Sequence, residues 1–208
     1  VSSLTHNTCF SDLSGGITLN AIGGTSPYSY RVNQGNLQSS SVFSGLSTGS
    51  FIAWAIDKNN CTDTVNFTIE YRDAIKPTVA LKNITRYVNA AGNVTISLSE
   101  VDNGITDNCG IASTRISPNT FNCQTLGANF VTVTATDLKG NQMSQTCTVT
   151  VLDTLVPNLK TKSAGIYLNA AGTATLNASA LNDASTDNCG ITSFVASQNN
   201  FNCTHLGQ

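Results

Sequence analysis

The chain has 208 residues, only 11% of them charged, and its formal net charge is −2 at pH 7. This weak, balanced charge is not that of a disordered polyelectrolyte, and the sequence has no Lys/Arg cluster that would indicate a nucleic-acid partner. Its apolar residues come in short runs, so the sequence predicts no membrane insertion.

Strand patterns follow one another along the chain. β-branched or aromatic residues alternate with small polar ones, as in half-buried antiparallel strands, in the segments 15–22, 50–56, 93–99, 129–137 and 146–153. Gly, Asn, Asp and Pro gather between these segments, which indicates turns, and no window has helical periodicity. We therefore expect an all-β chain of tandem, small, immunoglobulin-like antiparallel β-sandwiches, arranged as beads on a string.

A tandem repeat organises most of the chain. The hexapeptide TDNCGI at 106–111 recurs at 186–191, and the same offset aligns two copies of NAAG and two of FNC, at 89–92 and 169–172 and at 121–123 and 201–203. The offset predicts three parts: a first module (1–72), a first repeat (73–152) and a second repeat (153–208). Residues 130–153 have no counterpart in the second repeat, so we expect that repeat to be incomplete and the chain to be cut from a longer protein.

Seven cysteines in so weakly charged a chain predict disulfides and an oxidising compartment. No two cysteines have the close spacing of a zinc site. Cys9 and Cys61 bracket the first module, and we expect them to form a bond. In the first repeat the expected strand register favours Cys123–Cys147 and leaves Cys109 as an alternative partner of either.

Several loops of the first repeat carry oxygen donors. The expected strand directions place these loops at the end of the first repeat that adjoins the first module. The donors are Asp73, Asp102, Asp107, Asn108, Asp137 and Asn141. Such a cluster of oxygen donors suits calcium. Calcium is the one cofactor that we consider, and we expect that the chain requires no cofactor. The alternative is that these side chains cap turns by hydrogen bonding to nearby backbone groups.

Two resemblances add to this interpretation. In the first module, a cysteine, the core GGTSPYSYRVNQG, the LxxGxY-like segment LSTGSF and the closing DKNNC resemble the SprB repeat of a surface adhesin of gliding Flavobacterium, although Phe51 replaces the usual tyrosine and Asn60 the usual glycine. TDNCG, FNC, VTATDLKGN and TCTVTVLD make the two later parts resemble the hyalin-like (HYR-like) immunoglobulin-type repeats of Bacteroidota surface proteins. The resemblance implies type IX secretion and an extracellular, outer-membrane-associated location at the cell surface.

Two threonines match a short modification pattern. Asp63-Thr64-Val65 and Asp153-Thr154-Leu155 resemble the O-glycosylation site of Bacteroidota, which makes Thr64 and Thr154 candidate glycan acceptors.

The sequence contains no motif of nucleophilic, metalloprotease or P-loop chemistry, and we expect no enzyme activity. We interpret Tyr28, Tyr30 and Trp54 as core residues rather than a sugar platform. The favoured function is a repeat segment of a long cell-surface adhesin, forming a rigid disulfide-stabilised stalk or filament for surface attachment and gliding motility. The alternatives are a glycan- or protein-binding module and accessory spacer domains of a secreted enzyme. The expected partners are neighbouring modules of the same chain, the motility and secretion machinery, and surface polysaccharide.

Overall fold

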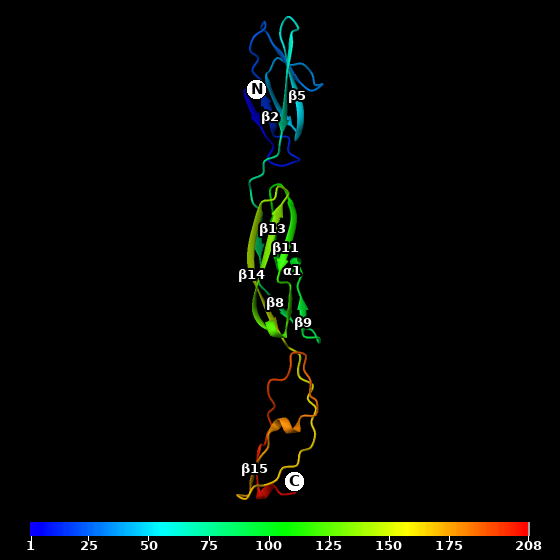
Figure 1. Cartoon of the computed structure of the whole chain (residues 1–208), viewed down its shortest axis with the longest axis vertical. Coiled ribbons are helices and arrows are strands. Elements are labelled where there is room, and N and C mark those ends of the chain that lie inside the picture. Colours follow the sequence, from blue (N-terminus) through cyan, green and yellow to red (C-terminus); the bar gives the residue numbers. More distant parts are fainter. Residues whose placement is uncertain (208) are drawn as a thin grey trace. The chain divides into compact units, whose positions relative to one another are not determined.

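The computed structural model describes residues 1–207, and Figure 1 labels several of its strands and the helix α1. The chain divides into two compact units: unit 1 holds residues 1–80, 103–115 and 133–145, and unit 2 holds 81–102, 116–132 and 146–208. The division falls within the first repeat. Unit 1 therefore contains the boundary between the first module and the first repeat, whereas unit 2 contains the boundary between the two repeats.

The first module consists of two antiparallel three-stranded sheets. One has the order β1-β2-β4 and is formed by β1 (Ser3–Thr5), β2 (Gly15–Thr18) and β4 (Val42–Leu46). The other has the order β3-β5-β6 and is formed by β3 (Ser29–Val32), β5 (Gly49–Ile56) and β6 (Thr62–Ile69). Both sheets contribute to one core, made of Ile17, Leu19, Tyr30, Ala53, Phe67 and Ile69. This arrangement is the predicted β-sandwich.

The first repeat is also built of strands. The pair β10-β7 joins β7 (Thr78–Leu81) to β10 (Asp102–Thr106), and the antiparallel pair β12-β9 joins β9 (Asn93–Thr95) to β12 (Thr120–Asn122). A four-stranded sheet has the order β11-β13-β14-β8, with β8 (Ile84–Tyr87), β11 (Ile111–Ser117), β13 (Gly127–Asp137) and β14 (Gln142–Leu152). Within that sheet β8 runs parallel to β14.

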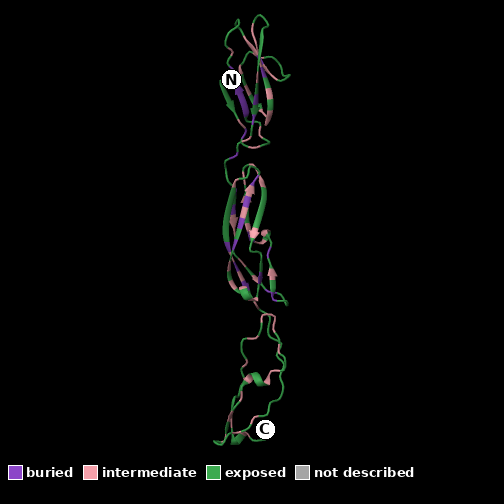
Figure 2. Cartoon of the chain, in the orientation of Figure 1, coloured by how far each residue is buried: buried purple, intermediate pink, exposed green. Residues whose placement is uncertain are grey.

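Burial alternates along the two longest strands, as the sequence pattern predicts. Val131, Val133 and Ala135 of β13 are fully buried, and so are Val149 and Val151 of β14. Figure 2 colours buried residues purple and exposed ones green, and both colours occur along the strands of the first repeat. Because neighbouring residues of a strand point to opposite faces, the alternation gives each strand one apolar and one polar face. The all-β, immunoglobulin-like class is thus confirmed.

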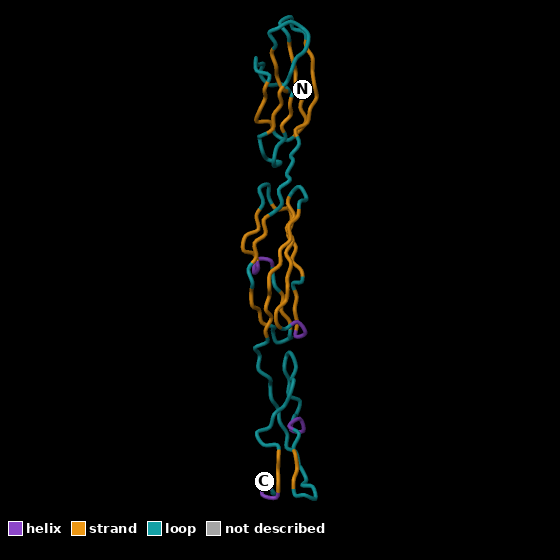
Figure 3. The backbone as a smooth tube through the Cα atoms, turned by 90° about the vertical axis from the view of Figure 1, so that its left-hand side faces the viewer, coloured by secondary structure: helices purple, strands orange, loops and turns teal. Residues whose placement is uncertain are grey.

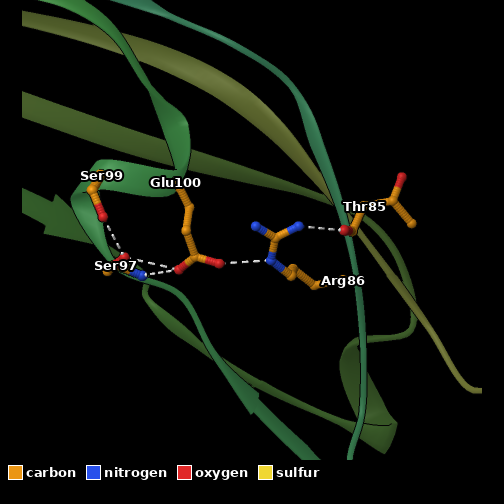
Figure 4. Close-up of polar contacts among 5 residues, drawn as sticks. All are labelled: Thr85, Arg86, Ser97, Ser99 and Glu100. Atoms are coloured by element: carbon orange, nitrogen blue, oxygen red, sulfur yellow. Dashed lines mark hydrogen bonds and ion pairs between the residues drawn. The ribbon is translucent and has the colours of Figure 1, made fainter.

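The predicted strand 93–99 is only partly formed. β9 ends at Thr95, and the helix α1 (Leu98–Val101) follows, with Ser97 as its N-cap. Glu100 accepts hydrogen bonds from the backbone N–H and the hydroxyl of Ser97 (2.5 and 2.9 Å) and pairs with Arg86 Nε (2.6 Å), as Figure 4 shows. The S-x-x-E capping pattern thus prevails over the strand propensity of this segment.

The second repeat has few strands. Its antiparallel pair joins β15 (Thr173–Thr175) to β16 (Asn200–Asn202). It also contains two short 3-10 helices, η2 (Ala178–Leu181) and η3 (Cys203–His205). The counterpart of η3 in the first repeat is η1 (Cys123–Thr125). The rest is drawn as loop in Figure 3. Tyr167 and Val195 of this repeat are 94% and 91% exposed. Across residues 1–207, no helix has the length and apolarity needed to cross a membrane.

Candidate functional site

The structure brings the repeated motifs together at the two boundaries between parts of the chain. We call the boundary in unit 1 joint 1 and the boundary in unit 2 joint 2. At joint 1, Cys9 of the first module is bonded to Cys109 of the first repeat, with a Cα–Cα distance of 5.2 Å. At joint 2, Cys123 of the first repeat is bonded to Cys189 of the second, with a Cα–Cα distance of 5.1 Å. Each disulfide therefore links one part to the next.

The predicted pairings within a module were wrong. Cys61 and Cys147 are free, and Cys9 and Cys123 have other partners than those expected. Cys61 directly precedes β6, whereas Cys9 follows Asn7, which bridges to Tyr71 beyond the far end of that strand. The eight residues of β6 span about 25 Å, far more than a disulfide can bridge. Cys147 is buried within β14.

The TDNCG loop is held in shape by its own aspartate. Asp107 Oδ1 accepts hydrogen bonds from the backbone N–H groups of Cys109 (2.8 Å) and Gly110 (3.0 Å). Gly110 has a φ of 104°, a conformation that glycine adopts without steric cost. The turn therefore presents the cysteine in a fixed position for its partner.

The asparagine of the loop ties it to the start of its own repeat. Asn108 Nδ2 donates to Asp73 Oδ1 at 3.3 Å, and the N–H of Ile75 donates to the same oxygen at 3.0 Å. Asp73 is buried, with 6% of its surface exposed. The residue that opens the repeat and the residue beside the joint cysteine thus form one hydrogen-bonded network.

A second loop of joint 1 is closed by Asp137 and Asn141. Asp137 Oδ1 accepts from the N–H groups of Lys139, Gly140 and Asn141, and its Oδ2 accepts from Asn141 Nδ2 at 2.8 Å. Burial acts to raise the pKa of the Asp137 carboxyl, but the hydrogen bonds from Asn141, Lys139 and Gly140 outweigh it and hold the pKa below its ordinary value of 3.8. Both oxygens of this carboxylate already have protein partners.

Asn141 also secures the linker. Its Nδ2 lies 3.2 Å from the carbonyl oxygen of Asp73 and 3.3 Å from that of Ile75. The DLKGN turn of the first repeat is thereby attached to the segment that enters the repeat.

Tyr71 packs in joint 1 between residues of both parts. Its ring contacts Phe10 edge-on, at 5.8 Å between centroids, and Lys139 Nζ lies 4.1 Å from its centroid on the ring face. Its hydroxyl donates to the carbonyl of Leu138 at 3.3 Å. Sequence reasoning missed Tyr71, although an aromatic residue two positions before Asp73, at the boundary, was an available signal.

Joint 2 repeats the hydrogen-bond pattern with the equivalent residues. Asp187 Oδ1 accepts from the N–H of Cys189 at 2.9 Å, and Asn188 Nδ2 donates to Asp153 Oδ1 at 3.1 Å. In addition, Asn188 Nδ2 donates to the carbonyl of Asn89 in the preceding repeat at 3.2 Å. The NAAG motif of one repeat therefore contacts the TDNCG loop of the next repeat.

Gly92, the last residue of NAAG, leaves room for this contact. Its φ is 72°, and a Cβ placed on it would lie 2.7 Å from Cys123 Sγ and 2.9 Å from the carbonyl oxygen of Asn188. The FNC motif supplies the cysteine, which is the first residue of η1. Asn122 Oδ1 caps this short helix by accepting from the N–H of Gln124 at 2.9 Å. We call the NAAG and FNC motifs of one repeat together its socket. Sequence reasoning noticed both motifs but not that they meet the hexapeptide.

Only part of the predicted calcium set comes together. Among the described residues, one group has the spacing of metal ligands: an oxygen of Asp73, an oxygen of Asp107 and Cys109 Sγ lie within 4.8 Å of one another. Cys109 is in a disulfide, which leaves the two carboxylates. Asn108 turns its amide nitrogen toward Asp73, Asp137 and Asn141 bond to each other, and Asp102 lies in unit 2 as the C-cap of α1.

The two candidate glycan acceptors lie at the surface. Thr64 on β6 and Thr154 after β14 are both exposed, so a glycan has access to either hydroxyl. Tyr30 is buried in the core of the first module as predicted, whereas Tyr28 and Trp54 are half-buried. These two line a hollow with a volume of about 360 Å³, and the guanidinium carbon of Arg31 lies 4.6 Å from the centroid of the Trp54 ring.

Comparisons with known proteins find similarity in solved structures alone. No protein-family model and no curated protein matches the sequence. The fibronectin(III)-like modules of CbhA from Clostridium thermocellum are 13% identical, over 73% of this chain and 92% of that one, with a TM-score of 0.29. The EC3-6 region of protocadherin gammaB7, in its cis-dimer structure, is 14% identical over 72% of this chain and 45% of that one, also with a TM-score of 0.29. Similarity at this level carries no argument about function.

Proposed function

We propose that the chain is a segment of a long cell-surface adhesin, in which tandem β-modules form a stalk that transmits mechanical tension. The observation that carries the proposal is the pair of disulfides that cross from one part to the next. Disulfides persist in oxidising, extracellular compartments, which agrees with a surface location. The SprB-like and HYR-like sequence motifs favour an adhesin of gliding bacteria, exported by type IX secretion.

The positions of the two bonds explain why such a chain resists extension. They enclose 100 and 66 residues of the sequence, in two loops that do not overlap. A pull on the termini follows the shortest covalent path, which passes through the sulfur atoms and bypasses both loops. If the modules unfold under load, the bonds withhold roughly 330–360 Å and 220–240 Å of extended chain, at about 3.3–3.6 Å per residue.

Single-molecule stretching of the chain between its termini tests this mechanical role. With the disulfides intact, we expect full unfolding to extend only residues 1–9, 109–123 and 189–208. Reduction should add the length of both loops, and Cys109→Ser should add that of the larger loop alone. An extension that is the same in oxidised and reduced protein would contradict the proposal.

The surface location needs a separate test in the source bacterium. Antibodies raised against residues 1–152 should label intact cells, and brief external proteolysis should remove the label. Labelling that requires permeabilised cells would contradict a cell-surface stalk.

Sugar binding by the first module is a second candidate function. The hollow beside Tyr28 and Trp54 supports it, since half-buried aromatic rings can pack against sugar faces. However, the Asp57 carboxylate in its wall already accepts from the N–H groups of Thr25, Asn59 and Cys61. Surface polysaccharide that changes the Trp54 fluorescence of the wild type but not of Tyr28→Ala would support this function, and an unchanged spectrum would remove it.

A further inference from the structure

The second repeat carries a complete copy of the socket that binds the TDNCG loop in joint 2. Asn169 Oδ1 accepts from the N–H groups of Ala171 (3.0 Å) and Thr173 (3.1 Å), as Asn89 Oδ1 does from those of Ala91 and Asn93. The backbone of Asn202, with φ −143° and ψ −173°, matches that of Asn122, with φ −144° and ψ −174°. The backbone of the motif is therefore the same in both repeats.

The sulfur of the copy also lies in the equivalent place. Cys203 Sγ is 3.8 Å from the carbonyl oxygen of Gly172, and Cys123 Sγ is 3.6 Å from that of Gly92. Gly172 has a φ of 71°, and a Cβ on it would lie 2.9 Å from Cys203 Sγ. Cys123 uses this geometry to bond Cys189, whereas Cys203 is free and exposed.

We propose that the socket around Cys203 binds the TDNCG loop of a further HYR-like repeat and forms a disulfide with its cysteine. This inference rests on the proposed function, since it extends the same joint to the next module. Bond formation converts two thiols into one disulfide, and a small disulfide such as oxidised glutathione accepts the two electrons and two protons and leaves as two thiols. In this joint the backbone carbonyl oxygen of Asn169 accepts a hydrogen bond from the side-chain amide of the asparagine in the TDNCG loop, as that of Asn89 does from Asn188.

The test is the chain extended after Gln208 by a second copy of residues 129–208, which continues the repeat because Gln208 stands in the place of Ala128. Refolded with reduced and oxidised glutathione, it should contain a third disulfide, between Cys203 and the TDNCG cysteine of the added repeat. Cys61, which is also exposed, serves as the internal control and should stay free. Gly172→Ala should lower the yield of the third bond without changing the other two.

The outcomes separate this inference from the proposed function. If Cys203 stays free while Cys9–Cys109 and Cys123–Cys189 form in the same molecule, the inference is wrong and the stalk proposal stands. If the added cysteine bonds Cys61 as often as Cys203, the socket gives no selectivity and the inference is again wrong. Absence of the first two bonds overturns the stalk proposal itself.

A different observation in joint 1 concerns two carboxylate oxygens. Asp73 Oδ2 and Asp107 Oδ2 are both buried and have no hydrogen-bond partner, although Oδ1 of each residue accepts two hydrogen bonds. Asp73 is more than nine-tenths buried, and the two carboxylates have oxygens within 4.8 Å of each other. The two ion pairs of the described residues involve other carboxylates, Glu70 and Glu100. Each carboxylate therefore has one buried oxygen without a donor, a position that a cation can fill.

We infer that a hard divalent cation, calcium, binds between Asp73 and Asp107 beside the Cys9–Cys109 disulfide. Carboxylate oxygens are its preferred ligands, and water can complete its coordination. Joint 2 differs at the same place, because the buried oxygen without a partner there is the neutral Asn188 Oδ1. The inferred site therefore belongs to joint 1 alone.

Calcium titration and melting of the whole chain test this site. Calorimetry should give one calcium site, and saturating calcium should raise the melting temperature by about 3–6 °C over a chelator. Asp73→Asn and Asp107→Asn keep the Oδ1 acceptor but remove the charge, so both should abolish the shift. The matched control Asp187→Asn changes the equivalent residue of joint 2, and this variant should show the same calcium-induced rise in melting temperature as the wild type.

Two results would overturn the calcium inference. One is the absence of binding heat together with identical melts in calcium and chelator, which would mean that water satisfies the two oxygens. The other is a calcium shift that persists in both joint 1 variants, which would place the ion elsewhere. The calorimetric result on the wild type decides the question even if a variant fails to fold.

Discussion

The side-chain amide of Asn188 donates to the backbone carbonyl of Asn89, at 3.2 Å, across the boundary between the two repeats. Both residues belong to repeated motifs, and the disulfide between Cys123 and Cys189 forms beside them. This contact explains why TDNCG and NAAG recur together. Each repeat must supply a loop to the part before it and a socket to the part after it.

The socket should be sensitive to a single methyl group at Gly92. Alanine there has to adopt a φ of 72° with its Cβ 2.7 Å from Cys123 Sγ. The φ value costs about 1–2 kcal/mol, and the overlap adds to it. We expect Gly92→Ala to lower both the melting temperature and the yield of Cys123–Cys189 in a glutathione buffer.

Gly23→Ala is the control for that experiment, because Gly23 has a φ of 87° and nothing within 4 Å of an added Cβ. It should lose stability from backbone strain alone and keep both disulfides at the wild-type yield. Equal bond yields in the two variants would show that Gly92 has no role in the socket.

Tyr71 should determine how readily the Cys9–Cys109 bond forms. Tyr71→Ala removes the contacts with Phe10 and Lys139, which together contribute about 1–2 kcal/mol. The equilibrium between the two thiols and the bond, measured in glutathione buffers, should shift toward the thiols by about tenfold. Tyr71→Phe loses only the hydroxyl that donates to Leu138 and should shift it far less. Equal shifts would assign the effect to the hydroxyl instead of the ring.

Glu100 should stabilise the fold at neutral pH and lose this effect in acid. The backbone N–H of Ser97, Arg86 and the Ser97 hydroxyl lower the pKa of its carboxyl from 4.5 to about 2. Because the folded-state pKa is the lower one, the contribution is complete above pH 4.5 and disappears as the pH falls toward 2. We expect Glu100→Gln to cost about 1 kcal/mol at pH 7, with a difference from wild type that narrows in acid melts.

Glu70→Gln provides the comparison, since Glu70 pairs with Arg72 on the surface, where their side chains are 56% and 63% exposed. Such a pair contributes roughly 0–1 kcal/mol, so this variant should melt close to the wild type. A Glu100 variant with the same small effect would contradict the role of the capping box.

The three free cysteines should differ in reactivity. Cys61 and Cys203 are exposed and should be alkylated rapidly in the native protein. Cys147 is buried, and burial raises the pKa of its thiol, so it should react only on unfolding. Mass spectrometry after timed alkylation measures the three rates. Rapid labelling of Cys147 would contradict its burial on β14.

Local patterns predicted the strands but not the bonds between modules. The alternation of Val131, Val133 and Ala135 with polar residues is enough to predict β13, because burial of one face is a property of the strand itself. Residues 97–99 were predicted as the end of strand 93–99, because the apolar alternation continues into them, whereas the structure forms the capping box of α1 there.

The disulfides were mispaired for a different reason. The prediction treated each module as closed, whereas Cys9 and Cys109 are 100 residues apart and meet only because two modules adjoin. One signal was available in the sequence: the first repeat has three cysteines, so at least one of them cannot pair within it. The convergence of Asp73 with Asp107 and Asn108 was predicted from strand direction, but which oxygens would lack partners depended on side-chain geometry.

Disulfide mapping tests the central claim most directly. The unreduced chain is alkylated, digested with protease and analysed by mass spectrometry for cross-linked peptides. The account predicts the pairs Cys9–Cys109 and Cys123–Cys189, with Cys61, Cys147 and Cys203 alkylated. The pairs Cys9–Cys61 and Cys123–Cys147, each within one module, would contradict it.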